Sequence, residues 1–237
     1  MTVIVVENPK GGVGKNTLAT NLAGYYFAAQ GEWVALADLD KPRSSHAWLS
    51  LRVDTLPKIE EWNIDVDTPG KPPKGLEKAV VDTPAGVHGN RLALSLQLAD
   101  KMTVPLQPSM FDILATQDFL AKLAKEKAVR KGAIEIGVVG MRVDARTRSA
   151  DQLHRFVEGL DLPVLGFLRA TRRTTCSSPR TASRSGMWRR VASRRISSNG
   201  RRSLNGSKRN EGSRRPCGYA GFFLAKRGDQ VQFCVGT

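Results

Sequence analysis

The stretch Lys10-Gly11-Gly12-Val13-Gly14-Lys15-Asn16-Thr17 decides the fold of this 237-residue chain. It follows an apolar, β-branched run at residues 3–6 and leads into apolar residues with helical spacing from Leu18 onwards. This order is typical of a strand, a phosphate-binding loop and a helix. Glycines let the backbone turn its N–H groups inwards, and the helix N-terminus adds positive partial charge. We therefore predict that the loop binds a polyphosphate, with Lys15 on the β- and γ-phosphates.

The loop departs at two positions from the general phosphate-loop pattern G-x-x-x-x-G-K-S/T. Pro9 stands at the first glycine, and Asn16 stands where a hydroxyl would contact magnesium. The stretch resembles the deviant form K-G-G-x-G-K-S/T-T of the ParA/MinD/Soj group of ATPases, which has a second lysine, here Lys10, at the start of the loop. The alternative is a glycine-rich turn with incidental lysines, which leaves the flanking strand and helix unexplained.

Two later apolar runs each end in aspartate. Residues 33–37 are predicted to form a buried strand that ends in Asp38-Leu39-Asp40, and residues 79–81 lead into Asp82-Thr83-Pro84-Ala85-Gly86. In an open parallel sheet, ligands gather at the carboxyl ends of the strands. A carboxylate there can hold Mg²⁺, and a glycine just after it lets the backbone approach the outer phosphate. The alternatives are a solvated aspartate turn at the first site and a capped turn without metal at the second.

Both aspartate motifs resemble hallmarks of the same ParA/MinD group, D-x-D and D-x-P-A/G-G, residue for residue. The resemblance implies that Asp40 positions the attacking water, that Asp38 lies near the metal, and that Asp82 holds magnesium through its water. After D-x-D the group usually continues with Pro-Gln, whereas this chain has Lys41-Pro42-Arg43. The shape of that loop is therefore left open.

Together these resemblances imply an ATPase that uses ATP and Mg²⁺. The expected nucleotide-binding residues are Gly11, Gly12, Val13, Gly14, Lys15, Asn16 and Thr17. The expected metal-binding residues are Asn16, Asp38 and Asp82, and the expected catalytic residues are Lys10, Lys15 and Asp40, with Lys10 reaching the phosphates of a partner subunit. Because the carboxamide of Asn16 is longer than a hydroxyl and can displace the ion, we expect slow hydrolysis with nucleotide binding partly retained.

Strands and helices alternate along the chain up to residue 168, which predicts a doubly wound α/β fold of the P-loop NTPase type, with a mostly parallel sheet and helices on both faces. Predicted helices cover residues 16–30, 44–51 (capped by Ser44), 91–99, 111–131 and 150–159. Predicted strands cover residues 3–6, 33–37, 79–82, 102–106, 134–139 and 163–168, with a possible short strand at 62–66. A hydrophobic content of 41% suits one such domain, at residues 1–169. No apolar run approaches a membrane span, and no export leader is recognised.

The net charge of +15 is confined to the C-terminal part. Residues 1–168 carry 20 Lys and Arg against 20 Asp and Glu, and residues 169–237 carry 17 against 2. The three cysteines, at 176, 217 and 234, also lie there, without metal-site spacing. Residues 170–237 are therefore predicted to be a disordered Arg/Ser-rich tail that binds nucleic acid non-specifically, or the product of a reading-frame slip near Thr171. The second explanation is favoured, because the related proteins continue there with ordered helices.

The resemblance extends over residues 2 to about 169 and implies a short ParA-type partition ATPase. Such a protein dimerises on ATP, binds DNA non-specifically and moves plasmid or chromosomal DNA with a ParB-like centromere-binding partner. It is expected to be cytoplasmic, nucleoid-associated and without a membrane partner. One alternative is a MinD-like membrane-cycling ATPase, although residues 218–237 supply no convincing amphipathic helix. Another is a non-hydrolysing nucleic-acid-binding protein that acts through its basic tail.

Overall fold

A seven-stranded parallel sheet forms the centre of the computed structural model, which describes residues 1–27, 31–64, 72–87 and 89–169. The strands are β1 (Thr2–Val6), β2 (Val34–Asp38), β3 (Ile59–Glu61), β4 (Lys78–Asp82), β5 (Lys101–Leu106), β6 (Glu135–Val143) and β7 (Val164–Arg169). Their order is β3-β2-β4-β1-β5-β6-β7, and every adjacent pair is parallel. The predicted doubly wound sheet is confirmed. The domain boundary placed after residue 169 stays a prediction, because residues 170–237 lie outside the described residues.

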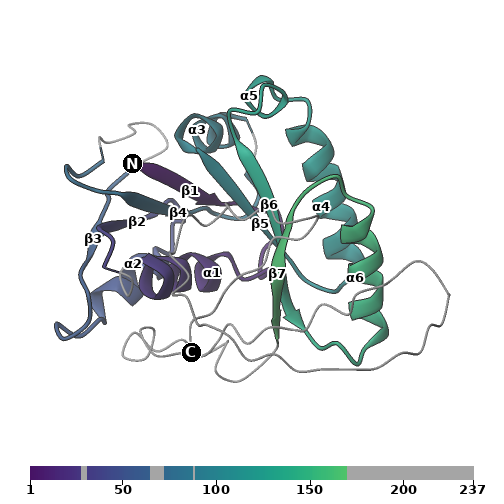
Figure 1. Cartoon of the computed structure of the whole chain (residues 1–237), viewed down its shortest axis with the longest axis horizontal. Coiled ribbons are helices and arrows are strands. Elements are labelled where there is room, and N and C mark those ends of the chain that lie inside the picture. Colours follow the sequence, from purple (N-terminus) through teal and green to yellow (C-terminus); the bar gives the residue numbers. More distant parts are fainter. Residues whose placement is uncertain (28–30, 65–71, 88, 170–237) are drawn as a thin grey trace, which may run out of the picture.

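Helices cover both faces of this sheet (Figure 1). They are α1 (Lys15–Asn21), continued by the π-helical turn η1 (Leu22–Phe27), α2 (Ser44–Ser50), α3 (Asn90–Leu98), α4 (Met110–Leu123), α5 (Lys127–Arg130) and α6 (Arg148–Glu158). In the view of Figure 1, α1 and α2 lie on one side of the strands, and α3, α4 and α6 lie on the other. Along the described residues, no helix has the length and apolar character needed to cross a bilayer.

Two hydrophobic cores, one on each face, hold the layers together. On one face, Leu18 and Leu22 from the first helical segment pack against Ile4 and Val6 of β1. On the opposite face, α4 and α6 pack their apolar side chains against the alternate residues of the strands. Strand residues such as those of β2 are buried along their whole length, as expected for a parallel sheet covered on both sides.

The central strand β1 lies where the chain changes its direction of travel across the sheet. It pairs with β4 on one side and with β5 on the other. From β1 the chain proceeds to β2 and β3, and after β4 it crosses to β5, β6 and β7. A crevice outside the carboxyl ends of the strands forms at such a switch point, and ligands of open α/β sheets bind there. The loops that follow β1, β2 and β4 meet at this edge.

Four local predictions were wrong in detail. Ser44 does not cap α2, because Arg43 is the N-cap residue with a left-handed φ of 49° and makes no side-chain cap. The short strand is Ile59–Glu61, whose register with β2 pairs Leu36 with Glu61. Residues 62–64 of the predicted strand 62–66 are not part of a strand, and residues 65 and 66 lie outside the described residues. The helix predicted at 111–131 is two helices, because the chain tightens at Lys125 and Glu126 into turns closed three residues back. β6 also runs to Val143, beyond the predicted end at 139.

Candidate nucleotide-binding site

The loop between β1 and α1 has the backbone geometry of an anion cradle. Gly12 and Gly14 have φ values of 76° and 98°, a conformation that residues with a Cβ rarely adopt. Gly14 is the N-cap of α1, and its carbonyl accepts the first helical hydrogen bond, from the Leu18 N–H at 2.9 Å. A Cβ on Gly14 would lie 2.9 Å from Cε of Met141 on β6. Glycine is therefore favoured at this position by its backbone angle, whereas the flexible end of the Met141 side chain can move aside.

Lys15 folds its side chain back into the loop. The side chain is almost fully buried, and its Nζ donates to the carbonyls of Asn8 and Lys10, both at 2.9 Å. Burial lowers the pKa of Lys15, and the nearby carboxylates of Glu7, Asp82 and Asp40, in that order, raise it. A lysine ammonium has three donors, of which these carbonyls take two. Lys15 is therefore positioned as a cation among loop carbonyls and acidic strand ends.

Asn8, which sequence analysis did not single out, anchors the start of the loop. Its Nδ2 donates to the carbonyl of Pro105 at 2.8 Å and to Oγ1 of Thr116 at 3.0 Å, and its Oδ1 accepts from the Lys10 N–H at 2.9 Å. The side chain is fully buried between β5 and α4. These bonds fix the backbone on which Lys10 and Lys15 sit. The signal in the sequence was an asparagine two residues after an apolar strand and two residues before the first lysine of the loop.

Two further contacts join the loop to neighbouring segments. Nε2 of Gln107, just after β5, donates to the carbonyl of Gly12 at 2.6 Å. The N–H of Gly86, in the turn after β4, donates to the carbonyl of Pro9 at 2.8 Å. Gly86 has a φ of 67°, so the turn uses the freedom of glycine at this point. The glycine-rich loop and the 82–86 motif therefore form one structural unit.

Asp82 lies at the centre of the acidic strand ends. It pairs in register with Val6 of β1 on one side and with Asp38 of β2 on the other. It is completely buried, and its Oδ2 accepts a hydrogen bond of 2.5 Å from Oγ of Ser45. Its Oδ1 is buried without a partner among the described residues. Burial raises the pKa of Asp82 to about 8, although the Ser45 hydrogen bond acts in the opposite direction.

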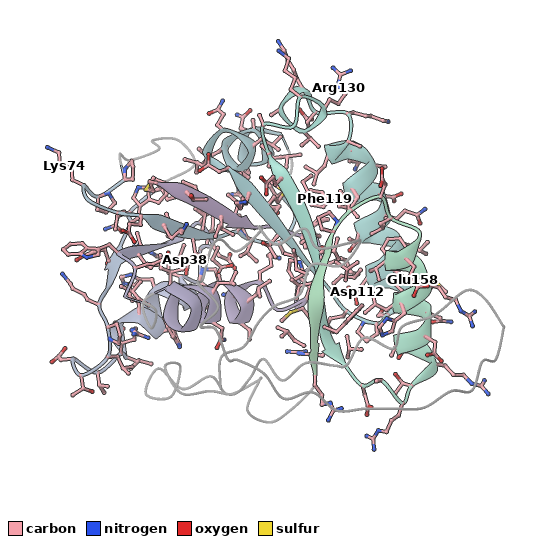
Figure 2. The ribbon with its side chains drawn as sticks, viewed as in Figure 1. Asp38, Lys74, Asp112, Phe119, Arg130 and Glu158 are labelled. Carbon is pink, nitrogen blue, oxygen red and sulfur yellow. The ribbon has the colours of Figure 1, made fainter. Side chains whose placement is uncertain are left out.

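Asp38 organises the loop that carries Asp40. Its Oδ1 accepts from the Asp40 N–H at 2.9 Å, and its Oδ2 accepts from the N–H groups of Ser45 at 2.8 Å and His46 at 3.1 Å. Figure 2 shows Asp38 within the body of the fold close to α1 and α2, whereas Lys74 and Arg130 project at the periphery. Asp38 therefore fastens the first turn of α2 to the sheet, and Asp40 follows on a loop shaped by that contact.

The residues at these strand ends suit Mg²⁺ bound together with a nucleotide. Asp82 has a buried carboxylate oxygen without a partner, and Ser45 and Asn16 add neutral oxygen atoms nearby in the fold. The described residues contain no cluster of three His, Cys, Asp or Glu that would hold a metal by itself. Mg²⁺ is usually held by one or two carboxylates together with waters and substrate phosphates, so a larger acidic cluster is not required.

A comparison with known protein families identifies the family that has this arrangement of loop and strand ends. Residues 4–178 match the model of the CobQ/CobB/MinD/ParA nucleotide-binding domain. The chain belongs to this family. The match includes the glycine-rich loop and both aspartate motifs, so the family predicted from these motifs is confirmed, and so is nucleotide binding as its general property.

Two related sequences and one solved structure support the assignment to the CobQ/CobB/MinD/ParA family. The maintenance of carboxysome distribution protein A of Gloeobacter kilaueensis is 31% identical over 180 residues, which cover 71% of this chain and 76% of that protein. Protein ParA of Rhizobium radiobacter is 29% identical over 154 residues, which cover 63% of this chain and 68% of that protein. The structure of septum site-determining protein MinD of Pyrococcus horikoshii, complexed with Mg-ADP, has a TM-score of 0.55 at 15% identity and covers 75% of this chain and 86% of its own. That last likeness shows a common fold.

The structure brings most of the predicted site residues of this MinD/ParA family member to one edge of the sheet. Lys15, Asp40 and Asp82 are close enough for both carboxylates to raise the lysine pKa. Lys10, Asn16 and Thr17 belong to the same loop and first helical turn. The individual roles of these residues stay predictions. Asp38 is at the expected place, but its oxygens are hydrogen-bonded to backbone N–H groups.

Glu7, which sequence analysis also missed, is a second buried acid behind the loop. It directly follows β1 and is fully buried, and its Oε2 accepts from Oγ of Ser95 on α3 at 3.1 Å. Burial raises the pKa of Glu7 to about 7, against the lowering effects of the Ser95 hydrogen bond and the Lys15 charge. The signal available in the sequence was an acidic residue between an apolar strand and a phosphate loop.

The raised pKa of Glu7 predicts that the stability of the nucleotide-free protein falls as pH rises. Its pKa is about 7 in the folded chain against an ordinary 4.5, so the folded state holds the proton more tightly. Its contribution is fully present below pH 4.5 and is lost as pH rises through 7. We expect the free energy of unfolding to drop by roughly 2–4 kcal/mol over this window, and Glu7→Gln to remove that drop.

Urea unfolding at pH 5, 6, 7 and 8 in EDTA measures this effect. The exposed Glu126→Gln is the matched control, and its pH profile should follow that of the parent. Asp82 acts in the same direction, because its pKa is also raised, to about 8. The free energy of unfolding of Glu7→Gln should therefore fall less with rising pH than that of the parent, but it should still fall. Parallel profiles for Glu7→Gln and the parent would show that Glu7 does not hold a proton in this range.

Proposed function

We propose that this protein is a ParA-type partition ATPase that binds ATP and Mg²⁺, dimerises on ATP, binds DNA non-specifically and moves plasmid or chromosomal DNA with a ParB-like partner. The observation that carries the proposal is the convergence of Lys15, Asp40 and Asp82, which come from three separate motifs, at one sheet edge. Family membership and a relative named ParA support it. The proposed location is the bacterial cytoplasm, on the nucleoid.

Each motif has a proposed task in the reaction. The backbone N–H groups of residues 11–17 and the ammonium of Lys15 bind the phosphates and hold them in position. Asn16 would supply an oxygen atom to the magnesium ion, Asp82 would hold the ion through a water, and the ion would neutralise phosphate charge. Asp40 orients the attacking water, since its loop is fixed by Asp38 at the edge of the site. Lys10 neutralises developing charge on the phosphates of the partner subunit.

Replacing Asn16 tests the proposed weak point of the loop. We expect Asn16→Thr to raise the rate of ATP hydrolysis, by about tenfold or more, because a loop hydroxyl is the usual magnesium ligand at this position. Steady-state phosphate release at saturating ATP measures the change. Asn90→Thr, at the exposed start of α3, is the control for the replacement of an asparagine at the start of a helix. An Asn16→Thr rate equal to that of the parent would contradict the assignment.

Nucleotide-dependent DNA binding tests the function as a whole. The full chain is incubated with a non-specific DNA duplex in ATP, in ADP and without nucleotide, and binding and dimer formation are followed by mobility shift and size-exclusion chromatography. We expect both to require ATP. Dimers that form on ATP but bind anionic vesicles rather than DNA would favour the MinD-like alternative.

The basic C-terminal part provides a second arm of the same experiment. Residues 169–237 carry an excess of 15 positive charges. A chain that ends at residue 169 keeps only Arg169 from this segment. Loss of DNA binding in this shortened chain, combined with indifference to ATP in the full chain, would favour the non-hydrolysing nucleic-acid-binding alternative. ATP-dependent DNA binding by the shortened chain would place the DNA-binding surface within the ATPase domain.

A further inference from the structure

Ser45 is buried at the point where the second helix meets the acidic strand ends. It is the second residue of α2, and it is completely buried, whereas its neighbour Ser44 is exposed. Its Oγ donates to Oδ2 of Asp82, and its backbone N–H donates to Oδ2 of Asp38 at 2.8 Å. The hydroxyl is thus directed at Asp82, the aspartate with the proposed magnesium role, and away from solvent.

The chemistry of this hydrogen bond leaves the Ser45 oxygen able to bind a cation. A serine hydroxyl has one donor hydrogen and two acceptor lone pairs. The hydroxyl hydrogen is donated to Asp82. The lone pairs on the Ser45 oxygen stay available, and oxygen is the ligand atom that Mg²⁺ prefers. The adjacent Oδ1 of Asp82 is buried and has no partner among the described residues. The neutral Oγ of Ser45 and the carboxylate Oδ1 of Asp82 therefore lie close together, and each has a lone pair with which to bind a cation.

Phosphate loops normally place this kind of hydroxyl on the loop itself. There a loop serine or threonine and a strand-end aspartate hold magnesium together. In this chain the loop position is Asn16, so the hydroxyl is missing from that side. The hydroxyl bonded to Asp82 comes instead from α2.

We propose that Ser45 supplies the hydroxyl ligand of the nucleotide-bound Mg²⁺ that the loop lacks at Asn16. This inference rests on the proposed nucleotide function of the same site. It assigns Asp38 a positioning task, because its carboxylate holds the first turn of α2, and with it Ser45, against the strand ends. On the outer side of the turn, Nη2 of Arg43 bonds Glu61 at 3.1 Å and Asn63 at 2.9 Å, which adds a second attachment to the sheet edge.

The contribution of magnesium to nucleotide affinity tests the proposal without reference to turnover. The full chain is titrated with a fluorescent ATP analogue, once in excess Mg²⁺ and once in EDTA, and the ratio of the two dissociation constants gives the magnesium contribution. We expect Ser45→Ala to reduce this ratio about tenfold and to leave the dissociation constant in EDTA unchanged. The exposed Ser44→Ala is the matched control and should keep the ratio of the parent.

A double-mutant cycle distinguishes a ligand from a merely structural serine. Asn16→Thr should restore the magnesium contribution in the Ser45→Ala background, because it returns a hydroxyl to the ion, and its effect should be smaller in the parent background. Ser45→Cys keeps the size of the side chain while replacing oxygen with sulfur. It should lose the Mg²⁺ contribution and regain a metal contribution with Cd²⁺, which Ser44→Cys should not show.

The outcomes separate this inference from the proposed function. An unchanged magnesium ratio in Ser45→Ala and Ser45→Cys would overturn the assignment of Ser45 while the nucleotide site stands. Equal losses in Mg²⁺ and in EDTA, without rescue by Asn16→Thr, would also overturn it, since they would show a structural role. Absence of analogue binding by the parent under both conditions would overturn the proposed function itself, and the role of Ser45 with it.

Discussion

Lys15→Met should abolish triphosphate binding. We expect a loss of at least about 100-fold in affinity for ATP, because the ammonium charge is removed together with its remaining donor to phosphate, and a hydrogen bond to a charged group alone contributes about 1.5–3 kcal/mol. Methionine fills a similar volume, but the carbonyls of Asn8 and Lys10 lose their shared donor. Isothermal titration with ATP and Mg²⁺ measures the effect, and far-UV circular dichroism verifies that the variant is folded.

Lys10→Gln is the control that separates the two lysines. Lys10 is only partly buried and lies at the start of the loop, where the proposed role is on the partner's phosphates. This variant should bind ATP with nearly the affinity of the parent and lose most of its hydrolysis. ATP binding by Lys15→Met at the affinity of the parent would contradict the phosphate-loop assignment. Equal loss of ATP binding in both variants would contradict the separate role given to Lys10.

Gly140→Ala should destabilise the sheet where β6 pairs with β7. A Cβ at Gly140 would lie 2.3 Å from Cδ1 of Phe167 on the neighbouring strand β7 and 3.2 Å from Cγ2 of Val143. The phenyl ring is restrained, because it also packs against His154 with 4.2 Å between ring centroids. We expect the free energy of unfolding to fall by about 1–3 kcal/mol, the usual cost of overpacking. Urea unfolding monitored by tryptophan fluorescence measures it.

Two further variants identify crowding as the cause. Gly132→Ala meets nothing within 4 Å but has a φ of 68°, so it should cost only about 1 kcal/mol through its backbone. Phe167→Ala removes the clashing ring, and in its background Gly140→Ala should be much less harmful than in the parent. Additive losses in the double variant would show that the contact between these strands does not explain the effect.

The fold could be predicted because its signals are local and repeated. Buried parallel strands such as β1 and β4 are continuous apolar runs, and the glycines of the phosphate loop have backbone angles that few other residues adopt. The positions of Lys15 and Asp82 followed, because strand ends meet at one edge. Helix ends and the short edge strand were less accurate. Their limits depend on pairing register and on contacts such as that between Asp38 and α2.

The residues that sequence analysis missed are those whose task depends on the packing of distant segments. Glu7 meets Ser95, 88 residues away, and Asn8 meets Thr116, 108 residues away. Ser45 looked like one of two serines at a helix start, and only the packing of α2 onto the strand ends distinguishes it from Ser44. No spacing rule in the sequence carries such information.

The position of β1 has a consequence for synthesis of the chain. It is the first strand made, yet its neighbours β4 and β5 begin at Lys78 and Lys101. At about 5–20 residues per second, the ribosome needs roughly 5–20 s to synthesise the chain from β1 to the end of β5. Until β4 has been made, this apolar β-branched strand has no native neighbour to pair with, and its second neighbour follows only with β5. The pairing of β1 on both of its edges can therefore be completed only after the 101–106 segment has emerged from the exit tunnel.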